Sequence, residues 1–321
     1  MDDKEEERLL TGLGKGVTDM SLKSYRARLD QFKTATSKAL GPSLLNVADS
    51  YKKLQKAYPN TVTRKTIVTS IVSVFKHNPD FEALHKKQAS EWRVRQRHLS
   101  EMEQAIRDNN VVTDAMRAKL PDIAAVSEIA EKLKVDPPGL DSKKKSMQHL
   151  LLRMMVDMPP KRSDLGSVKV CGAATPVPEH GRNAKRPNVD GNFVVVHRTG
   201  PITLVLQDYK TSKFYGTFVE RLPDGISKDV RESLKKYPRQ HVFEDKDGKP
   251  YDGHAFGEYV KRTFKEYTNK PSGINAIRHA YIIATTKGKT KAERRKIATS
   301  MNHSLNQQYD YDLIGGARRK I

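Results

Sequence analysis

The hydrophobic pattern changes its period twice along the sequence, and this change limits the folds that the chain can adopt. Apolar residues recur at helical spacing between residues 21 and about 115. The pattern becomes β-like between Phe193 and Leu222, where Val, Leu, Phe and Tyr are frequent, and it is helical again from Ser227 onward. The sequence therefore predicts a mainly helical chain with a small antiparallel sheet in its second half.

The first helical stretch contains three predicted helices. Ser21 is placed to cap the first, the second follows Thr63, and the third begins near Pro79. Pro42 and the pair Pro59–Asn60 should interrupt them. The third helix is rich in Lys and Arg, so this module could clamp a DNA backbone, although a plain helical bundle with a solvated face has the same pattern.

Composition divides the chain into three parts. Residues 1–20 are acidic and are predicted to be a flexible tail. Residues 109–146 are rich in Pro and Lys and place a domain boundary near residue 118. The prediction is thus a helical domain over residues 21–117 and a mixed α/β domain over residues 118–321.

The second domain is expected to begin with a helix from about Lys145 to Val156 and to contain an exposed loop at residues 171–192. The predicted strands are Phe193–His197, Ile202–Tyr209 and Phe214–Leu222. Lys210–Lys213 lies between the last two strands, so it is predicted to be a hairpin turn.

The charge of the chain needs a partner that explains it. The formal net charge is +21 in 321 residues. Nucleic acid is the commonest explanation, because basic side chains displace counterions condensed on phosphates. A merely soluble basic protein is the alternative.

Several classes of site have no support in the sequence. Cys171 is the single cysteine, which excludes an internal disulfide and fits a reducing compartment. The ten histidines show no metal-ligand spacing, and no Gly-rich phosphate loop occurs. No stretch approaches the roughly 18 apolar residues of a membrane span. We therefore expect no ATP, no NAD, no fixed metal and no membrane partner.

Four segments of the second domain carry residue types that together suit phosphate chemistry. They are PPKRSD with Arg162, DYKTSKFYG with Lys210, GINAIRHAYI with Asn275, Arg278 and His279, and SMNHSLNQQYDYDL with His303, Tyr309 and Tyr311. Each segment alone is a weak signal, and their order along the chain is the informative feature.

This order resembles that of the tyrosine recombinase, or phage integrase, family. The resemblance covers residues 146–321, and MNHS followed by a tyrosine is its most specific part, with IRHAY next. The helical module resembles the core-binding domain of that family more loosely. The residues of the motifs PPKRSD and DYKTSKFYG most resemble those of the branch of the family that viruses and transposons carry.

The resemblance implies a role for each residue. Arg162 and Arg278 would bind the non-bridging oxygens of a phosphodiester, and Tyr311 would attack it to form a 3′-phosphotyrosine link. Lys210 would protonate the leaving oxygen, and His303 would hydrogen-bond the phosphate or assist with its charge. The covalent link conserves the bond energy, so the resemblance implies neither ATP nor metal.

Two departures from the family pattern stand out. The position three residues before Arg278 is Asn275, where the family has His or Lys; an amide can bind phosphate but cannot move a proton at neutral pH. Tyr311 lies eight residues after His303 and Tyr309 lies six, and the slightly longer spacing of the family favours Tyr311. On a helix the two would point about 200° apart, so only one could face the site.

The leading hypothesis is a site-specific DNA recombinase or integrase that works on double-stranded DNA inside the cell, in the nucleus if the host is eukaryotic. The resemblance implies a homodimer on each site and a homotetramer at synapsis. A telomere resolvase or a type IB-like topoisomerase would use the same chemistry. A catalytically inactive DNA-binding regulator is the third hypothesis, and Asn275 is the feature that supports it.

Overall fold

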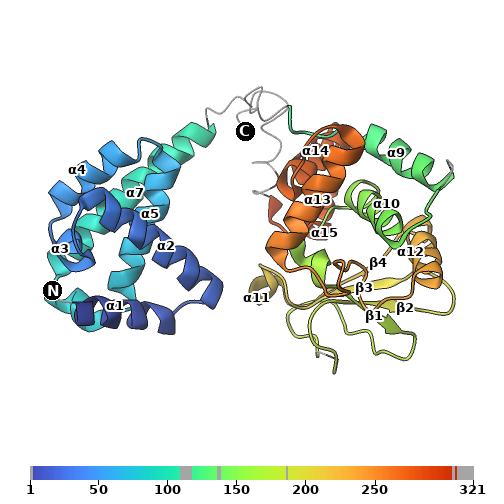
Figure 1. Cartoon of the computed structure of the whole chain (residues 1–321), viewed down its shortest axis with the longest axis horizontal. Helices are drawn as coiled ribbons and strands as arrows, with labels where there is room; N and C mark the ends of the chain where they lie inside the picture. The colour runs from blue at the N-terminus through green and yellow to red at the C-terminus, as the bar shows by residue number, and fades with distance from the viewer. Residues whose placement is uncertain (1–2, 109–117, 136–138, 186, 306–307, 309–321) are drawn as a thin grey trace. The chain divides into compact units, whose positions relative to one another are not determined.

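The chain forms two compact units, each with its own hydrophobic core (Figure 1). The structure is a computed structural model and describes residues 3–108, 118–135, 139–185, 187–305 and 308. The units are Met1–Asn110 and Val111–Ile321.

Helices build the described part of the first unit. They are α1 Asp3–Lys15, α2 Asp19–Thr36, α3 Leu40–Leu45, α4 Val47–Ala57, α5 Thr61–Lys76, α6 Pro79–Leu84 and α7 Lys86–Asp108. Trp92 of α7 is fully buried at the centre of this unit. Its indole N–H donates to the Leu44 carbonyl at 2.9 Å, and its ring meets Phe32 edge-on with centroids 5.6 Å apart. This contact joins α7 to α2 and α3.

The first residues of the chain do not form the predicted flexible tail. Residues 3–15 form α1, in which Leu9 and Leu13 lie one turn apart and are completely buried. Glu6 pairs with Lys33 of α2 at 2.6 Å. The prediction is wrong there because two leucines at helical spacing outweigh the acidic composition of the segment.

Two helix boundaries also differ from expectation. Thr18, not Ser21, caps α2, and its hydroxyl accepts the Ser21 N–H at 3.3 Å. Pro42 does not interrupt a helix. It lies in the first turn of α3, where its missing N–H removes no helical hydrogen bond.

The second unit packs helices against one small sheet. Its helices are α9 Ile123–Val135, α10 Lys143–Val156, η1 Ser163–Ser167, α11 Ser212–Tyr215, α12 Asp224–Lys236, α13 Gly253–Thr268, α14 Ile274–Thr286 and α15 Lys291–Ser300. The strands are β1 Lys169–Gly172, β2 Phe193–Val196, β3 Thr203–Leu206 and β4 Phe218–Arg221, in that order across the sheet. The predicted mainly helical class with one small sheet is confirmed.

The sheet is mixed rather than purely antiparallel. β2, β3 and β4 are antiparallel neighbours, but β1 pairs with β2 in parallel, from Lys169–Phe193 to Gly172–Val196. The four-residue β1 lies at the start of the predicted loop and has too few apolar residues to be recognised by alternation. The antiparallel pairing of β3 and β4 is confirmed, but the predicted strand start is wrong: Phe214 and Tyr215 belong to the single-turn α11, and β4 begins at Phe218.

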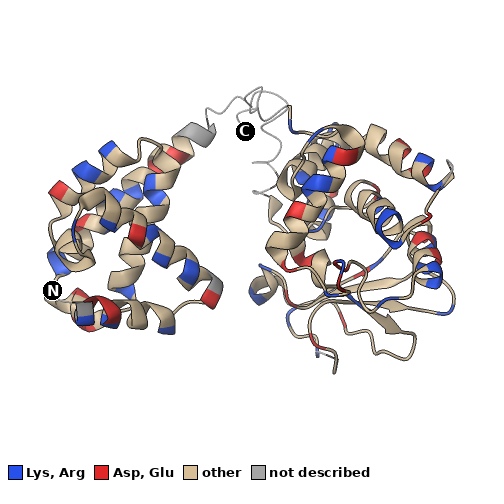
Figure 2. Cartoon of the chain, in the orientation of Figure 1, with Lys and Arg blue, Asp and Glu red and all other residues tan. Residues whose placement is uncertain are grey.

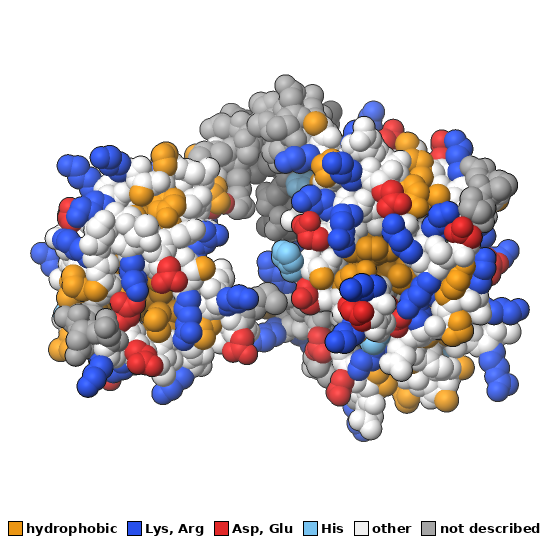
Figure 3. Space-filling model, in the orientation of Figure 1, with side chains coloured by type: hydrophobic (Ala, Val, Ile, Leu, Met, Phe, Trp, Pro, Cys, Tyr) orange, Lys and Arg blue, Asp and Glu red, His pale blue; other side chains and the backbone are white. Residues whose placement is uncertain are grey.

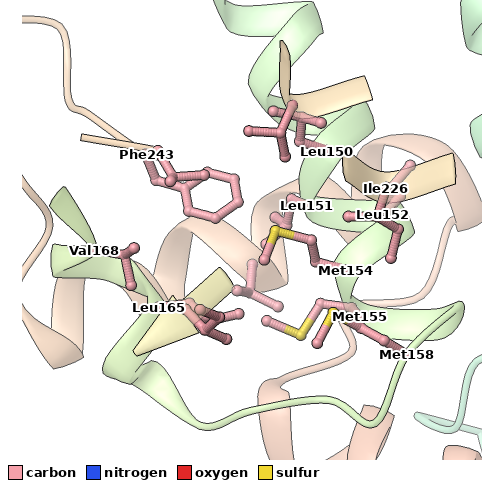
Figure 4. Packing of buried hydrophobic residues seen from close by; sticks show 14 of the residues in the cluster. Leu150, Leu151, Leu152, Met154, Met155, Met158, Leu165, Val168, Ile226 and Phe243 are labelled. Carbon is pink, nitrogen blue, oxygen red and sulfur yellow. The ribbon is translucent and has the colours of Figure 1, made fainter. Parts of the chain in front are cut away.

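Helix α10 lies at the centre of the main core. Leu150, Leu151 and Leu152 are consecutive and fully buried, so this helix is covered on all sides (Figure 4). Alternation along the strands splits the sheet into two faces: Val194 and Leu204 join this core, and Val195 packs on the opposite face in a smaller cluster that includes Val189 of the loop.

Basic side chains occur on both units. Figure 2 shows Lys and Arg on helices and loops of each unit, and the visible face in Figure 3 has many of them between fewer acidic groups. Within the described ranges, no helix is both long and apolar enough to cross a membrane.

Candidate active site

The end of α15 positions His303. Asn302 has a left-handed backbone (φ 54°), and the His303 N–H reaches back to the Ala298 carbonyl at 3.1 Å. This is a common way to end a helix, and Asn adopts the left-handed conformation more readily than most residues. The MNHS sequence therefore turns the chain sharply and directs His303 inward, where its side chain is 6% exposed.

Arg278 of α14 is the buried centre of the candidate site. Its side chain has no exposed surface, although arginine is almost never fully buried. Nη1 donates to the Pro160 carbonyl, and Nη2 donates to the Met301 carbonyl at 3.0 Å and lies 2.9 Å from Nδ1 of His303. One guanidinium thus joins the segment before η1 to the turn after α15.

His303 is neutral in this environment. Burial, followed by the charges of Arg278 and Arg162, lowers the pKa of His303 to about 3. Since Nδ1 faces a permanent donor on Arg278, the ring proton belongs on Nε2. His303 can therefore donate a hydrogen bond from Nε2 at neutral pH but carries no positive charge.

Arg162 lies near His303. It directly precedes η1, is half-buried, and is close enough to His303 for its charge to lower the pKa of that ring. Burial raises the pKa of Asp164, and the charge of Arg162 opposes this rise. The structure thus brings Arg162, Arg278 and His303 together from three of the four segments singled out in the sequence.

Lys161 is a member of this cluster that sequence reasoning missed. Its side chain is 1% exposed, its Nζ pairs with Glu220 of β4 at 2.6 Å, and it donates to the Ser300 carbonyl at 2.5 Å. It also lies 4.3 Å from the ring centroid of Phe218. Lys161 therefore ties β4 to the end of α15. A lysine beside an arginine has the sequence pattern of surface charge, so nothing in the sequence distinguished it.

The connection between β3 and β4 reaches the same turn. The Thr211 hydroxyl donates to the Asn302 carbonyl at 3.5 Å, directly before His303. Lys210, the preceding residue, is exposed. The segment DYKTSKFYG thus reaches the site through Thr211, and the side chain of Lys210 is exposed to solvent.

The remaining predicted residues are placed less centrally. Asn275 is exposed and lies one turn before Arg278, on the same side of α14, while His279 is half-buried. Tyr311 and Tyr309, the two candidate nucleophiles, lie outside the described residues.

The cluster suits an anion better than a metal. In the part of the chain that the structure describes, no group of three or more His, Cys, Asp or Glu side chains could hold a metal ion. Two guanidinium groups and a neutral imidazole donor are groups that can bind a phosphate and stabilise charge developing on it.

No protein-family model matches the chain, and no curated protein sequence matches it. Solved structures to which the chain is similar include a lambda integrase dimer bound to a COC′ core site, with 11% identity, a TM-score of 0.48, and coverage of 99% of this chain and 95% of that chain. XerA recombinase has 11% identity and a TM-score of 0.40, covering 95% and 93%. XerH site-specific recombinase bound to difH substrate has 13% identity and a TM-score of 0.41, covering 94% and 91%. These likenesses assign no role to any residue.

Proposed function

We propose that the chain is a site-specific DNA recombinase or integrase of the tyrosine recombinase type. The observation that carries the proposal is the contact between Arg278 and His303, with Arg162 close enough to lower the pKa of the same imidazole. Segments far apart in the sequence thus bring together side chains of the types that can stabilise a phosphodiester under attack by a tyrosine, and this supports the proposal.

The arginines address the main obstacle to this reaction. A phosphodiester repels nucleophiles because its oxygens are negatively charged, and Arg162 and Arg278 would offset that charge as it grows in the transition state. Losing one such donor commonly lowers the rate by about 10²–10³-fold. The contacts of Arg278 with backbone carbonyls hold it in place before the substrate arrives.

The reaction exchanges one ester bond of the phosphodiester for another, so the number of ester bonds to phosphorus does not change. The hydroxyl oxygen of Tyr311, or of its rival Tyr309, forms a bond to phosphorus and loses its proton to water. The bond from phosphorus to the 5′ oxygen breaks, and Lys210 protonates that oxygen. The 5′ hydroxyl of a second strand then attacks the phosphotyrosine, which joins the two DNA strands and releases the tyrosine. No hydrolysis occurs, so the reaction needs no ATP.

His303 would act as a hydrogen-bond donor rather than as the proton source. A ring with a pKa of about 3 is neutral at pH 7, so Nε2–H can bind a non-bridging oxygen. Of the two roles that the resemblance allowed, the low pKa of the ring supports hydrogen bonding to the phosphate. Asn275 would support the same phosphate with its amide.

A duplex nicked close to the cleavage point tests the chemistry, because the short leaving strand diffuses away and traps the intermediate. We expect a covalent protein–DNA adduct with the wild type and with Tyr309→Phe, and none with Tyr311→Phe. An adduct that survives Tyr311→Phe and disappears in Tyr309→Phe would move the nucleophile to Tyr309. No adduct with the wild type would refute the enzyme proposal.

Lys210 has its own test. The Lys210→Met variant should not cleave the normal duplex. It should still cleave a duplex whose 5′ bridging oxygen is replaced by sulfur, since a thiolate leaves without a proton. Lys228→Met, at a lysine of α12 whose side chain is 72% exposed, is the control and should cleave both. Equal loss on both substrates would remove Lys210 from the acid role.

Three other functions remain as outcomes of these experiments. A telomere resolvase or a type IB-like topoisomerase would give the adduct but yield hairpin ends or relaxed circles, whereas a recombinase yields crossover products. A catalytically inactive regulator would bind duplex DNA without forming an adduct. For the recombinase we propose a homodimer on each DNA site, a homotetramer at synapsis, a viral or transposon source, and action where the DNA is, in the nucleus of a eukaryotic host.

A further inference from the structure

The connection between β3 and β4 displays two adjacent aromatic side chains to solvent. Phe214 is 64% exposed and Tyr215 is 43% exposed, and both belong to α11. No other aromatic residue is among the exposed large hydrophobic side chains in the described ranges. Single exposed apolar residues need no explanation, but a neighbouring aromatic pair beside a candidate active site marks a contact surface.

The backbone that carries the pair is held firmly. The Tyr209 hydroxyl donates to the Gly216 carbonyl at 2.8 Å, and Nε of Arg182 donates to the Phe214 carbonyl. Thr217 and Gly181 exchange backbone hydrogen bonds of 2.8 and 2.9 Å. The aromatic rings are thus presented on a fixed support, so little conformational freedom would be lost when they meet a partner.

Gly216 allows this support to form. Its φ of 75° with ψ of −151° is a conformation essentially restricted to glycine, and a Cβ there would lie 2.1 Å from the Gly181 carbonyl oxygen. The turn after Tyr215 can therefore approach the loop at residue 181 only because residue 216 has no side chain.

The charges around the pair favour a polyanion as the partner. Lys210, Lys213 and Arg182 are exposed on the same connection or bonded to it, against one exposed acid, Asp208. A second copy of the chain, with a net charge of +21, would be repelled from this surface in the absence of DNA. A nucleic acid supplies both phosphates for the cations and flat bases for the rings.

We propose that Phe214 and Tyr215 form an aromatic wedge that contacts bases next to the cleaved phosphate and holds them unstacked. The inference rests on the proposed function and deepens it. Thr211 joins this connection to Asn302, so the wedge lies a few residues from both Lys210 and the turn that carries His303. Opening a base step there would free the cut strand to leave its duplex and pair with another.

The experiment uses the full chain with both Tyr309→Phe and Tyr311→Phe, so that binding is measured without cleavage. The probe is a 30-base-pair duplex selected by this chain from a random-sequence pool, with 2-aminopurine placed at each position in turn. We expect fluorescence to rise at one or two neighbouring positions. Adding Phe214→Ala and Tyr215→Ala should abolish the rise and weaken binding about tenfold to hundredfold.

Two matched variants separate an aromatic contact from other effects. Val177→Ala removes a side chain of similar exposure, 41%, and should change neither affinity nor fluorescence. Lys213→Gln should lower the slope of affinity against salt by about one, whereas the double alanine variant should leave this slope unchanged. Both wedge residues are exposed, so thermal unfolding should not shift.

Three results would overturn the wedge. One is an unchanged affinity and fluorescence signal in the double alanine variant. Another is normal binding to a single site with loss of only the higher oligomers, which would make the pair a contact between protomers. The third is failure of any duplex to be enriched. The adduct assay is independent of these measurements. If the fluorescence and affinity results support the wedge but no adduct forms, only the enzyme proposal is refuted.

Discussion

Replacing Lys161 with methionine tests whether the buried ion pair supports the candidate site. Burial is the largest influence on this lysine and lowers its pKa, with Arg278 adding to the effect and Glu220 opposing it. The ammonium is therefore not a strong stabiliser by itself. The cost of Lys161→Met should come from what it leaves behind: the Glu220 carboxylate and the Ser300 carbonyl without their donor.

The exposure of Glu220 sets the size of the effect. Removing one partner of a fully buried pair costs about 3–5 kcal/mol, but the Glu220 side chain is 21% exposed and water can reach part of it. We therefore expect Lys161→Met to lower the free energy of unfolding by about 2–3 kcal/mol. Glu220→Gln should cost more, because it leaves an ammonium that is 1% exposed. The double variant should cost less than the sum of the two.

Urea unfolding measures these differences, with far-UV circular dichroism following both units. Trp92 is the only tryptophan and lies in the first unit, so its fluorescence is an internal control whose midpoint should not move. We would reject this explanation if Lys161→Met lowered the free energy of unfolding by less than about 1 kcal/mol, or if the losses in the double variant were additive. Either result would mean that the groups left without a partner do not cause the loss.

Stability should fall as the pH drops from 6.5 toward about 3, because the folded state lowers the pKa of His303 and the unfolded chain holds more protons in that window. His303→Gln should flatten the fall by up to about 1.4 kcal/mol per pH unit, measured by urea unfolding at several pH values. Arg278→Lys should reduce adduct formation about 10²–10³-fold in the nicked-duplex assay; an unchanged rate would remove Arg278 from the site. Gly216→Ala should cost more than about 2 kcal/mol in thermal unfolding because of its backbone conformation and the nearby carbonyl. Trp92→Phe should cost about 1–3 kcal/mol in urea, since the Leu44 carbonyl loses its donor.

The sequence predicted those features that repeat or that occur in a recognisable order. Helical and alternating patterns revealed the class of fold and the β3–β4 hairpin, because both depend on local periodicity. The order of the four segments led to Arg162, Arg278 and His303, which lie near one another, and to the connection whose Thr211 reaches the Asn302 carbonyl. The roles of these residues, and the placement of Lys210 at the site, stay predictions. Tertiary contacts are harder to predict from the sequence. The burial of Leu9 and Leu13 stabilises a helix in an acidic segment that the composition assigned to a flexible tail.

The features that the sequence did not predict are those that depend on three-dimensional neighbours. Lys161 looks like any surface lysine until Glu220 and Ser300 are placed beside it. The neutral state of His303 follows first from its burial and then from the charges of Arg278 and Arg162, and no sequence spacing specifies these neighbours. β1 owes its existence to pairing with β2 rather than to its own alternation.

The hydrogen bonds that close the candidate site also set when it can form during synthesis. Arg278 reaches Pro160 across 118 residues, and Lys161 reaches Ser300 across 139, whereas Trp92 and Leu44 in the first unit are 48 apart. Every residue of the first core is available once α7 has left the ribosome, but the site must wait for the turn after α15. A chain arrested between these points could have a folded first unit without the candidate site. The candidate site would thus form only after the residues as far as the turn after α15 have been made.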